Sequence, residues 1–379
     1  MNSTHALKEI QDKVFHSRIE ESLILLNKVW KDKQDSKEIL ETLQPLSLFA
    51  FSHRWPSIHV PKEHEYLLRL LRLIPENEQI DFLNRFVEYL ARVPKYVNDE
   101  TGSFPSDGEG TPRDYKQEYL SSLDAHKGMA ALFSAFKMAE SEGLKEIFRT
   151  ILQVGCNDVS QTAGHYFSCT ESVVRLGLGA GMPRDKNHIF LLTQYLMQFS
   201  PIIITNYRKP TQNLDKILTR LVKKGGFVGY HYMIVANGLI KNREFLGEKH
   251  YSHALHGLET IILQLDDTLS KEKLDLAIKN EPKSGDSLKD LKGHVWKGEK
   301  AKAFAVLRQY LKEEGVTQRL KAAIAHSFTN INNHDPHYVT VPTSVFELIP
   351  SLKNEEVELA LAHSIEFAVD RIRKYGVVA

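Results

Sequence analysis

Cysteine is scarce in this chain, since only Cys156 and Cys169 occur among 379 residues. Two cysteines cannot build the disulfide framework of a small secreted protein, and they favour a reducing compartment. The sequence also lacks CxxC and HExxH, which are common local signatures of zinc sites. Any metal site in this protein must therefore be assembled from residues that are distant in the sequence.

The chain has no excess charge of either sign and no long apolar run. Lys and Arg number 49 against 48 Asp and Glu, which gives a net charge of +1 and no electrostatic basis for nucleic-acid binding. The N-terminal MNSTHALKEIQDK lacks the apolar region of a secretory signal, and runs such as 189–199 are too short to span a bilayer. We expect a cytoplasmic protein that binds neither nucleic acid nor membrane.

Convincing strand patterns are also rare. The GLGAG stretch at 177–181 resembles a phosphate loop, but it follows a helical pattern, whereas a dinucleotide loop follows a strand. Neither NAD nor a nucleotide is therefore expected as a cofactor.

Helical periodicity dominates the chain and predicts an all-α fold of stacked αα-hairpin repeats, forming a curved solenoid or a closed α/α toroid. Residues 57–93 align with 332–372, so that His59 matches His334 and Leu-Ile-Pro at 73–75 matches 348–350. We expect one repeat domain over 1–379; an irregular helical bundle is the alternative. A loop at 94–117, rich in Pro, Gly and acids, is expected to lie on the surface and to gate access to a site.

Histidine is the residue type in excess. The chain has 17, about twice the average usage. Four occur as His-Tyr, beginning at His165, His231, His250 and His337, where roughly 0.6 such pairs are expected by chance. Seven residues after each His stands a small residue, Ser or Gly, on the same helix face. This register predicts that several helices direct an N-terminal His into a shared interior, while the adjacent Tyr packs between helices.

Imidazole and carboxylate side chains in such an interior suit a transition metal. His250, His253 and His256 follow at i, i+3 and i+6, and the drift of about 60° per step prevents all three from converging. His59 and Asp335 are further candidates for the site. The predicted metal ligands are His126, His165, His253, His256, Glu259, His334 and His337. The predicted acid–base residues are Tyr166, Tyr232 and His231.

These patterns favour a metal-dependent oxidoreductase or oxygenase of the non-haem iron type, acting on a small molecule in a His- and Tyr-lined pocket. Iron is the favoured metal and zinc the second choice. Three alternatives stay open at this level: a metal-dependent hydrolase, a non-catalytic interaction scaffold of helical repeats, and a metal-free pocket in which histidines only bind ligand by hydrogen bonds. The sequence leaves the substrate and the oligomeric state open.

Overall fold

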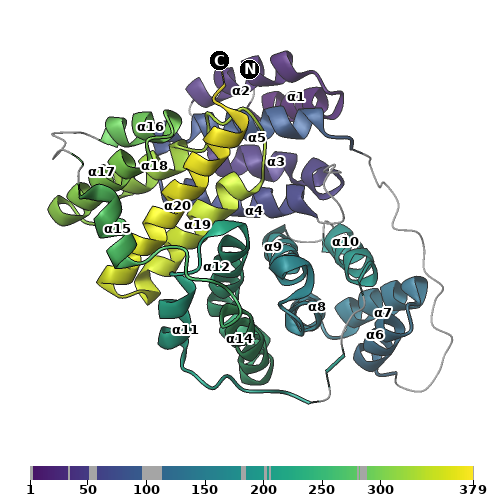
Figure 1. Cartoon of the computed structure of the whole chain (residues 1–379). Coiled ribbons are helices and arrows are strands. Elements are labelled where there is room, and N and C mark those ends of the chain that lie inside the picture. The colour runs from purple at the N-terminus through teal and green to yellow at the C-terminus, as the bar shows by residue number, and fades with distance from the viewer. Residues whose placement is uncertain are drawn as a thin grey trace.

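The fold was analysed in a computed structural model, which describes residues 3–32, 35–50, 58–95, 113–180, 185–199, 203–204, 206–279, 281 and 288–378 (Figure 1). These residues form twenty α-helices and three short 3-10 helices, with no β-strand among them. Two isolated bridges, Ala50 with Lys95 and Ile331 with Val377, are the extended pairings within the same ranges. The all-α class predicted from the sequence is confirmed.

The helices follow one another closely along the chain. The first half contains α1 (Ser3–Phe15), α2 (Ile19–Lys31), α3 (Ser36–Leu48), α4 (His59–Leu71), η1 (Glu76–Glu78), α5 (Ile80–Arg92), α6 (Tyr115–Asp124), α7 (Gly128–Ser141), α8 (Leu144–Cys156), η2 (Gln161–Gly164), α9 (His165–Ala180) and α10 (Asp185–Met197). The second half contains α11 (Leu214–Leu221), α12 (Gly226–Lys241), α13 (Arg243–Leu246), α14 (Glu248–Ile262), α15 (Lys271–Ile278), α16 (Leu288–Trp296), α17 (Lys300–Glu313), α18 (Gln318–His326), α19 (His337–Leu348), η3 (Ile349–Ser351) and α20 (Asn354–Tyr375).

Side-chain caps fix several helix starts. Asp35, Asp114, Asn213, Ser270 and Thr317 each accept a hydrogen bond from a backbone N–H in the first turn of the following helix. These residue types satisfy N–H groups that have no partner within the helix. Such caps are readable in the sequence, so these boundaries have a local cause.

Four helices form the centre of the fold. The helix α4 packs on α9, α9 on α12, α12 on α19, and α19 on α4, which closes a ring of four. All four run in the same direction. The helices α4, α9 and α19 begin at histidines that meet one another, and His231 near the start of α12 lies beside them. Near the opposite ends, Arg69 of α4 and Lys241 of α12 both contact Glu347 of α19. The N-terminal ends of the four helices therefore point into one shared space.

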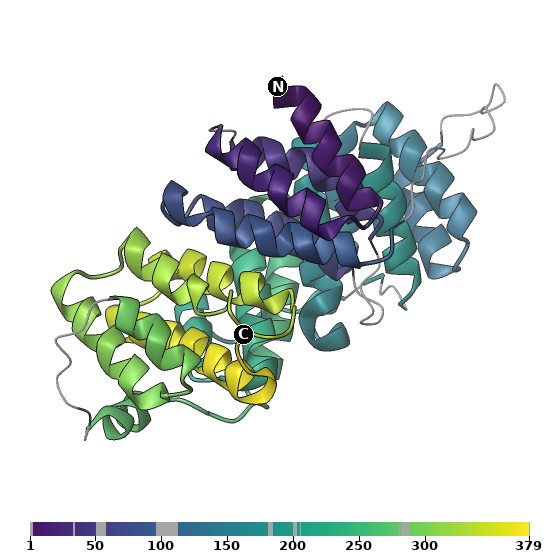
Figure 2. The same cartoon turned by 90° about the horizontal axis from the view of Figure 1, so that it is seen from above.

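Other helices cover the outside of this ring. The helices α3 and α5 pack on α4, α8 and α10 on α9, α14 on α12, and α18 and α20 on α19. Figure 1 shows the N-terminal helices α1, α2, α3 and α5 and the green helices α15–α18 as separate groups around the centre, and Figure 2 shows the purple-to-blue and green segments apart from above. The buried apolar side chains form one continuous cluster that extends from Ala6 to Ile372. Helix lengths and partners vary from pair to pair, so the fold does not by itself establish a regular solenoid or a closed toroid.

The two aligned segments do form comparable helix pairs. The helices α4 and α5 are separated by η1, and α19 and α20 by η3, and the first helices of the two pairs pack together. The sequence alignment, which matched His59 with His334, needs a shift. His59 is the first residue of α4, and the first residue of α19 is His337.

Two further sequence expectations bear on this arrangement. Of the predicted 94–117 loop, residues 96–112 lie outside the described ranges, and α6 already begins at Tyr115. Its gating role stays a prediction. Within the part of the chain that the structure describes, no helix combines the length and the apolar character needed to cross a membrane.

Candidate metal centre

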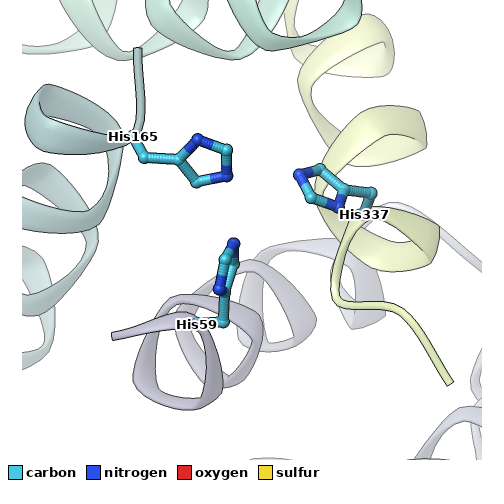
Figure 3. A group of neighbouring side chains, drawn as sticks. All are labelled: His59, His165 and His337. Atoms are coloured by element: carbon cyan, nitrogen blue, oxygen red, sulfur yellow. The ribbon is translucent and has the colours of Figure 1, made fainter. Parts of the chain in front are cut away.

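Four imidazole rings, three of them buried and that of His165 half-buried, meet where the four central helices begin. One ligand atom from each of His59, His165 and His337 can be chosen so that all three lie within 4.8 Å of one another (Figure 3). The fourth ring, His231 of α12, has its centroid 4.4 Å from that of His165 and 4.6 Å from that of His337. Each central helix thus contributes one histidine, and these four rings are called the histidine cluster below.

The position of His165 depends on a strained turn. Thr162, Ala163 and Gly164 have consecutive positive φ angles of 49°, 55° and 85° just before α9 begins. Non-glycine residues rarely adopt this conformation, and such strain is concentrated at functional sites. At Gly164 a Cβ atom would lie 2.6 Å from Cγ2 of Val235, so the Val235 side chain of α12 packs against a position that suits glycine. The turn also brings the Thr162 carbonyl oxygen to 2.7 Å from His165 Nδ1.

Asp335 positions His337. Its Oδ1 atom accepts hydrogen bonds from the His337 backbone N–H at 3.1 Å and from His337 Nδ1 at 2.5 Å. Both residues are buried, with exposed fractions of 1% and 5%. The carboxylate therefore fixes both the start of α19 and the orientation of the ring.

His231 is oriented from within its own helix. Its Nδ1 atom lies 2.6 Å from the carbonyl oxygen of Phe227, one turn earlier in α12. Three of the four rings thus place Nδ1 against an oxygen atom, belonging to Thr162, Phe227 or Asp335.

These contacts determine the tautomers. A carbonyl or carboxylate oxygen can only accept, so Nδ1 of His165, His231 and His337 carries the hydrogen and Nε2 carries a lone pair. Metal-binding histidines commonly show this arrangement, in which the second nitrogen donates to a carbonyl or carboxylate oxygen. His165 Nε2 is buried and has no hydrogen-bond partner among the described residues.

The Nε2 atoms of His231 and His337 lie 2.9 Å apart. With both hydrogens on Nδ1, two lone pairs face each other, so this contact requires a shared cation or proton. Burial, His337 and the Lys62 charge lower the pKa of His231 well below its usual range, and burial and Lys62 also lower the pKa of His165. Low pKa values disfavour protonation of these two rings, and metal binding requires neutral imidazole.

The distance between these two Nε2 atoms also bears on how they could bind one metal ion. Two imidazole nitrogens bound about 2.1 Å from one metal lie about 3.0 Å apart at a right angle, and about 3.4 Å apart at a tetrahedral angle. The 2.9 Å separation is nearer to that of adjacent ligands in octahedral or square-pyramidal coordination. The two nitrogens are thus close enough to bind one metal ion as adjacent ligands.

Lys62 lies one turn below the cluster. It is three residues after His59 on α4, is 1% exposed, and donates to the Ser168 hydroxyl at 2.8 Å. Ser168 stands three residues after His165, so the same helical spacing places both side chains beneath the rings. Burial lowers the pKa of Lys62, and the charges of Cys169, Glu171 and Asp335 oppose that shift.

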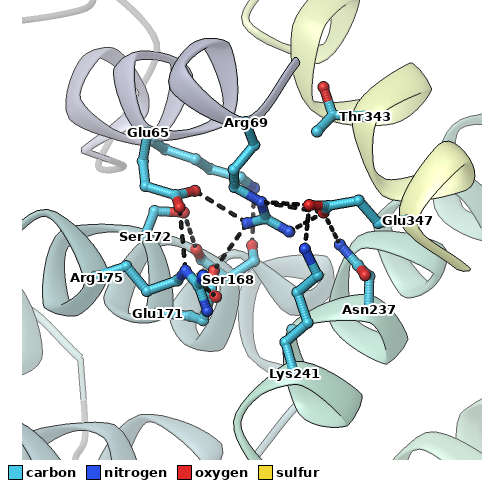
Figure 4. Close-up of polar contacts among 12 residues, drawn as sticks. Glu65, Arg69, Ser168, Glu171, Ser172, Arg175, Asn237, Lys241, Thr343 and Glu347 are labelled. Atoms are coloured by element: carbon cyan, nitrogen blue, oxygen red, sulfur yellow. Dashed lines mark hydrogen bonds and ion pairs between the residues drawn. The ribbon is translucent and has the colours of Figure 1, made fainter. Parts of the chain in front are cut away.

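A second polar layer fills the ring of helices nearer their C-terminal ends (Figure 4). Arg69 is 5% exposed; it donates to Glu65 at 2.9 Å and forms a bidentate pair with Glu347, while Glu171 lies 3.8 Å away. Lys241 and Asn237 also donate to Glu347. Despite burial, the Arg69 and Lys241 contacts lower the pKa of Glu347 to about 2. This layer closes the lower end of the space between the four helices.

The other predicted ligands lie elsewhere. His126 is exposed in the turn between α6 and α7, with a φ of 53°. His334 stacks on Tyr89, with ring centroids 3.7 Å apart, and its Nε2 lies 2.9 Å from Glu63 Oε2. His253 Nδ1 accepts the Arg208 backbone N–H at 3.0 Å. His334 therefore lies three residues before His337 on the same segment, but it contacts Glu63 and Tyr89. His126 and His253 also lie outside the cluster.

The remaining residues of the α14 stripe contact a neighbouring segment. Glu259 accepts hydrogen bonds from the backbone N–H of Thr211 at 2.7 Å and from its hydroxyl at 2.5 Å. His250 Nε2 lies 2.9 Å from the Tyr207 hydroxyl, whereas His256 Nδ1 has no partner among the described residues. In this arrangement the stripe holds the segment that leads into α11 against α14.

The tyrosines of the His-Tyr pairs pack between helices. Tyr166 is fully buried and lies against Tyr195 and Phe199, and Tyr232 and Tyr338 are 4% and 2% exposed. Burial raises the pKa of Tyr166 and Tyr232. Their predicted acid–base roles stay predictions, and their contacts are those of packing residues.

Sequence reasoning missed Lys62, Ser168 and the charged layer. The available signal was the spacing of three residues from His59 to Lys62 and from His165 to Ser168, which places each pair on one helix face. Compared with protein-family models, curated proteins and solved structures, the chain matches none of them.

Proposed function

We propose that this protein is a metal-dependent oxidoreductase in which His59, His165, His231 and His337 bind one iron ion. The convergence of the four rings from four parallel helices carries the proposal, together with the three Nδ1 hydrogen bonds that direct Nε2 lone pairs inward. Iron and zinc both accept imidazole, and the nitrogen pair 2.9 Å apart is close enough to bind one metal ion as adjacent ligands.

Four neutral imidazoles would leave two positions open on a six-coordinate ion. Open positions beside histidine ligands are what non-haem iron centres use for oxygen chemistry, with one site for substrate and one for dioxygen. The protein's own part is to hold the rings neutral and fixed: Thr162, Phe227 and Asp335 orient three of them. The charged layer around Arg69 keeps the opposite end of the helix ring closed.

We place the route of a small molecule to the cluster beside α12. Phe227 is 50% exposed, and its ring lies 4.4 Å from that of His231 and 5.6 Å from that of His337. Val228 beside it is 40% exposed, and the Arg371 guanidinium lies 5.5 Å from the Phe227 ring. In this proposal a small apolar molecule reaches the rings along the exposed side chain of Phe227.

The test uses protein purified without a His-tag and loaded anaerobically with Fe(II). Nitric oxide binds Fe(II) that has an open position and gives an electron paramagnetic resonance signal of spin 3/2. The proposal predicts stoichiometric iron, this signal, and oxygen uptake on addition of a reductant. Stoichiometric zinc with no oxygen uptake would instead favour the hydrolase alternative, and no bound metal after loading with either ion would leave the scaffold alternative.

A further inference from the structure

Lys62 is a buried lysine whose amino group has no contacting anion among the described residues, and burial lowers its pKa. Among the described residues, the Ser168 hydroxyl is the polar group within hydrogen-bond distance of Nζ, and no carboxylate oxygen lies within 4.0 Å of it. Glu171 and Asp335 are close enough for their charges to act on Lys62, but both have other partners: Asn242 for Glu171 and His337 for Asp335. An ammonium group buried to this extent is costly unless an anion contacts it.

The surroundings of Lys62 add to this positive potential. Lys62 stands three residues after His59, and its partner Ser168 stands three residues after His165, which places Nζ on the side of the histidine cluster. The helices α4, α9 and α19 all begin at the cluster, and helix N-termini carry partial positive charge. The Asp335 carboxylate contacts the cluster at His337, whose ring and backbone N–H already donate to its Oδ1 atom.

The charge balance becomes more uneven once a metal is bound. A divalent ion and the Lys62 ammonium would bring three positive charges. The Asp335 carboxylate offsets one of them, and Glu171, which is shared with Arg69 and Arg175, offsets part of the rest. The four imidazoles are neutral in this state and contribute none. A neutral substrate would leave this excess uncompensated in a buried space, whereas an anionic oxygen would contact both the metal and the ammonium group.

We propose that the space between the histidine cluster and Lys62 is a binding site for a small oxyanion, which coordinates the metal through oxygen and accepts a hydrogen bond from Lys62 Nζ. This inference rests on the proposed metal site and names the class of its substrate or co-substrate: a carboxylate or another anionic oxygen compound. Ser168 holds Nζ beneath the rings and so sets the direction of approach. Phe227, beside the rings, contacts the apolar part of the same molecule.

The test compares acetate with acetamide, which has nearly the same shape but no charge. Both are titrated into the Co(II)-loaded protein while the visible absorption of cobalt is followed. We expect acetate to change the spectrum saturably and acetamide to leave it unchanged. Charge-assisted hydrogen bonds are worth enough that Lys62→Met should raise the Kd for acetate by roughly tenfold or more. Lys62→Gln, which keeps a donor for Ser168 but not the charge, should show a similar loss.

Lys241→Met is the matched control, because it removes a lysine from the charged layer, where Glu347 pairs with it. This variant should bind acetate as the wild type does. Metal content and thermal unfolding are measured for every variant, so that a misfolded protein is recognised; if Lys62→Met does not fold, Lys62→Gln decides. Full cobalt loading with equal acetate affinity in wild type and Lys62 variants overturns the oxyanion site and leaves the metal site standing.

A wild type that binds no metal would contradict the proposed function instead. In that case isothermal titration of the metal-free protein with acetate decides the oxyanion site separately. Binding that Lys62→Gln abolishes supports an anion site that is independent of metal, and absence of Lys62-dependent binding overturns it.

Discussion

The Nε2 atoms of His231 and His337 lie 2.9 Å apart, although each ring already donates its Nδ1 hydrogen to an oxygen atom. Two neutral rings cannot form a hydrogen bond in that arrangement, because neither Nε2 carries a hydrogen. A shared proton or a bound metal ion resolves the conflict, and the other two rings lie close enough that they could hold the same metal. This relationship is the structural basis for treating the cluster as a metal site.

Removal of a cluster ring tests which histidines hold the metal. We expect His337→Ala and His231→Ala to reduce bound iron to background levels, because each change removes a ligand. His253→Ala is the matched control: its ring accepts the Arg208 N–H outside the cluster, so metal content should stay at the wild-type level. Elemental analysis of the purified proteins is the measurement. Iron lost from His253→Ala but kept in His337→Ala would contradict the assignment.

Asp335 is expected to act on the metal through His337. Asp335→Asn weakens the hydrogen bond that makes the ring a good donor and fixes its tautomer, so metal affinity should fall about 10- to 100-fold. Competition with a chelator of known affinity measures the change. Glu259 on α14 is a buried carboxylate that accepts a hydrogen bond from Thr211, so Glu259→Gln should leave the metal affinity unchanged. Equal affinities for all three proteins would remove Asp335 from the site.

Stability in acid depends on a histidine outside the cluster. His64 is fully buried, and burial with the His188 charge lowers its pKa to about 3. An unfolded chain takes up this proton near pH 6.5, so the folded state loses stability as pH falls from about 6.5 towards 3, by up to about 1.4 kcal/mol per pH unit. His64→Phe should flatten this dependence, as followed by urea unfolding at pH 7.5 and 5.0. His16→Phe changes an exposed ring and should leave the slope as in the wild type.

The same substitution probes hydrogen bonding at neutral pH. Neither ring nitrogen of His64 has a hydrogen-bond partner among the described residues, and the ring lies 5.3 Å from that of Phe86. An apolar ring of similar size removes the cost of the unpaired nitrogens, so His64→Phe is expected to be at least as stable as the wild type at pH 7.5. A large loss of stability there, together with an unchanged acid slope, would show that His64 makes essential polar contacts.

The charged layer should be sensitive to loss of its central cation. Arg69→Met leaves Glu65, Glu171 and Glu347 without their shared partner in a buried space, which is expected to cost about 3–5 kcal/mol of unfolding free energy. Arg92 forms an exposed pair with Glu88 one turn earlier, so Arg92→Met should cost about 0.5 kcal/mol or less. Urea unfolding monitored by circular dichroism measures both. Similar small losses would mean that the buried layer is solvated.

The sequence predicted the helices and part of the cluster for local reasons. Helical periodicity and capping residues act within one or two turns, so the all-α class could be read without tertiary contacts. The His-Tyr register placed His165, His231 and His337 at helix starts or in early turns, and the structure brings these three together. Three of the four cluster rings were thus visible as one repeated pattern.

The pattern of a His-Tyr pair with a small residue seven positions after the His also selected His250, which lies outside the cluster. The helix α14 has the same His-Tyr pair and small residue, but it packs on the outer side of α12, where His250 meets Tyr207. His59 lacks a following Tyr and was found only through an alignment that paired it with His334. Which helices form the inner ring is decided by long-range packing, so the burial of Lys62 and Arg69 could not be read from spacing alone.

X-ray absorption spectroscopy of the iron-loaded protein tests the central claim most directly. The account predicts a first shell of nitrogen and oxygen atoms at about 2.1 Å, with the multiple scattering of about four imidazole rings. His165→Ala, if it still binds iron, should lose one ring from that pattern. A spectrum with one imidazole or none, or with sulfur in the first shell, would contradict a metal centre built from His59, His165, His231 and His337.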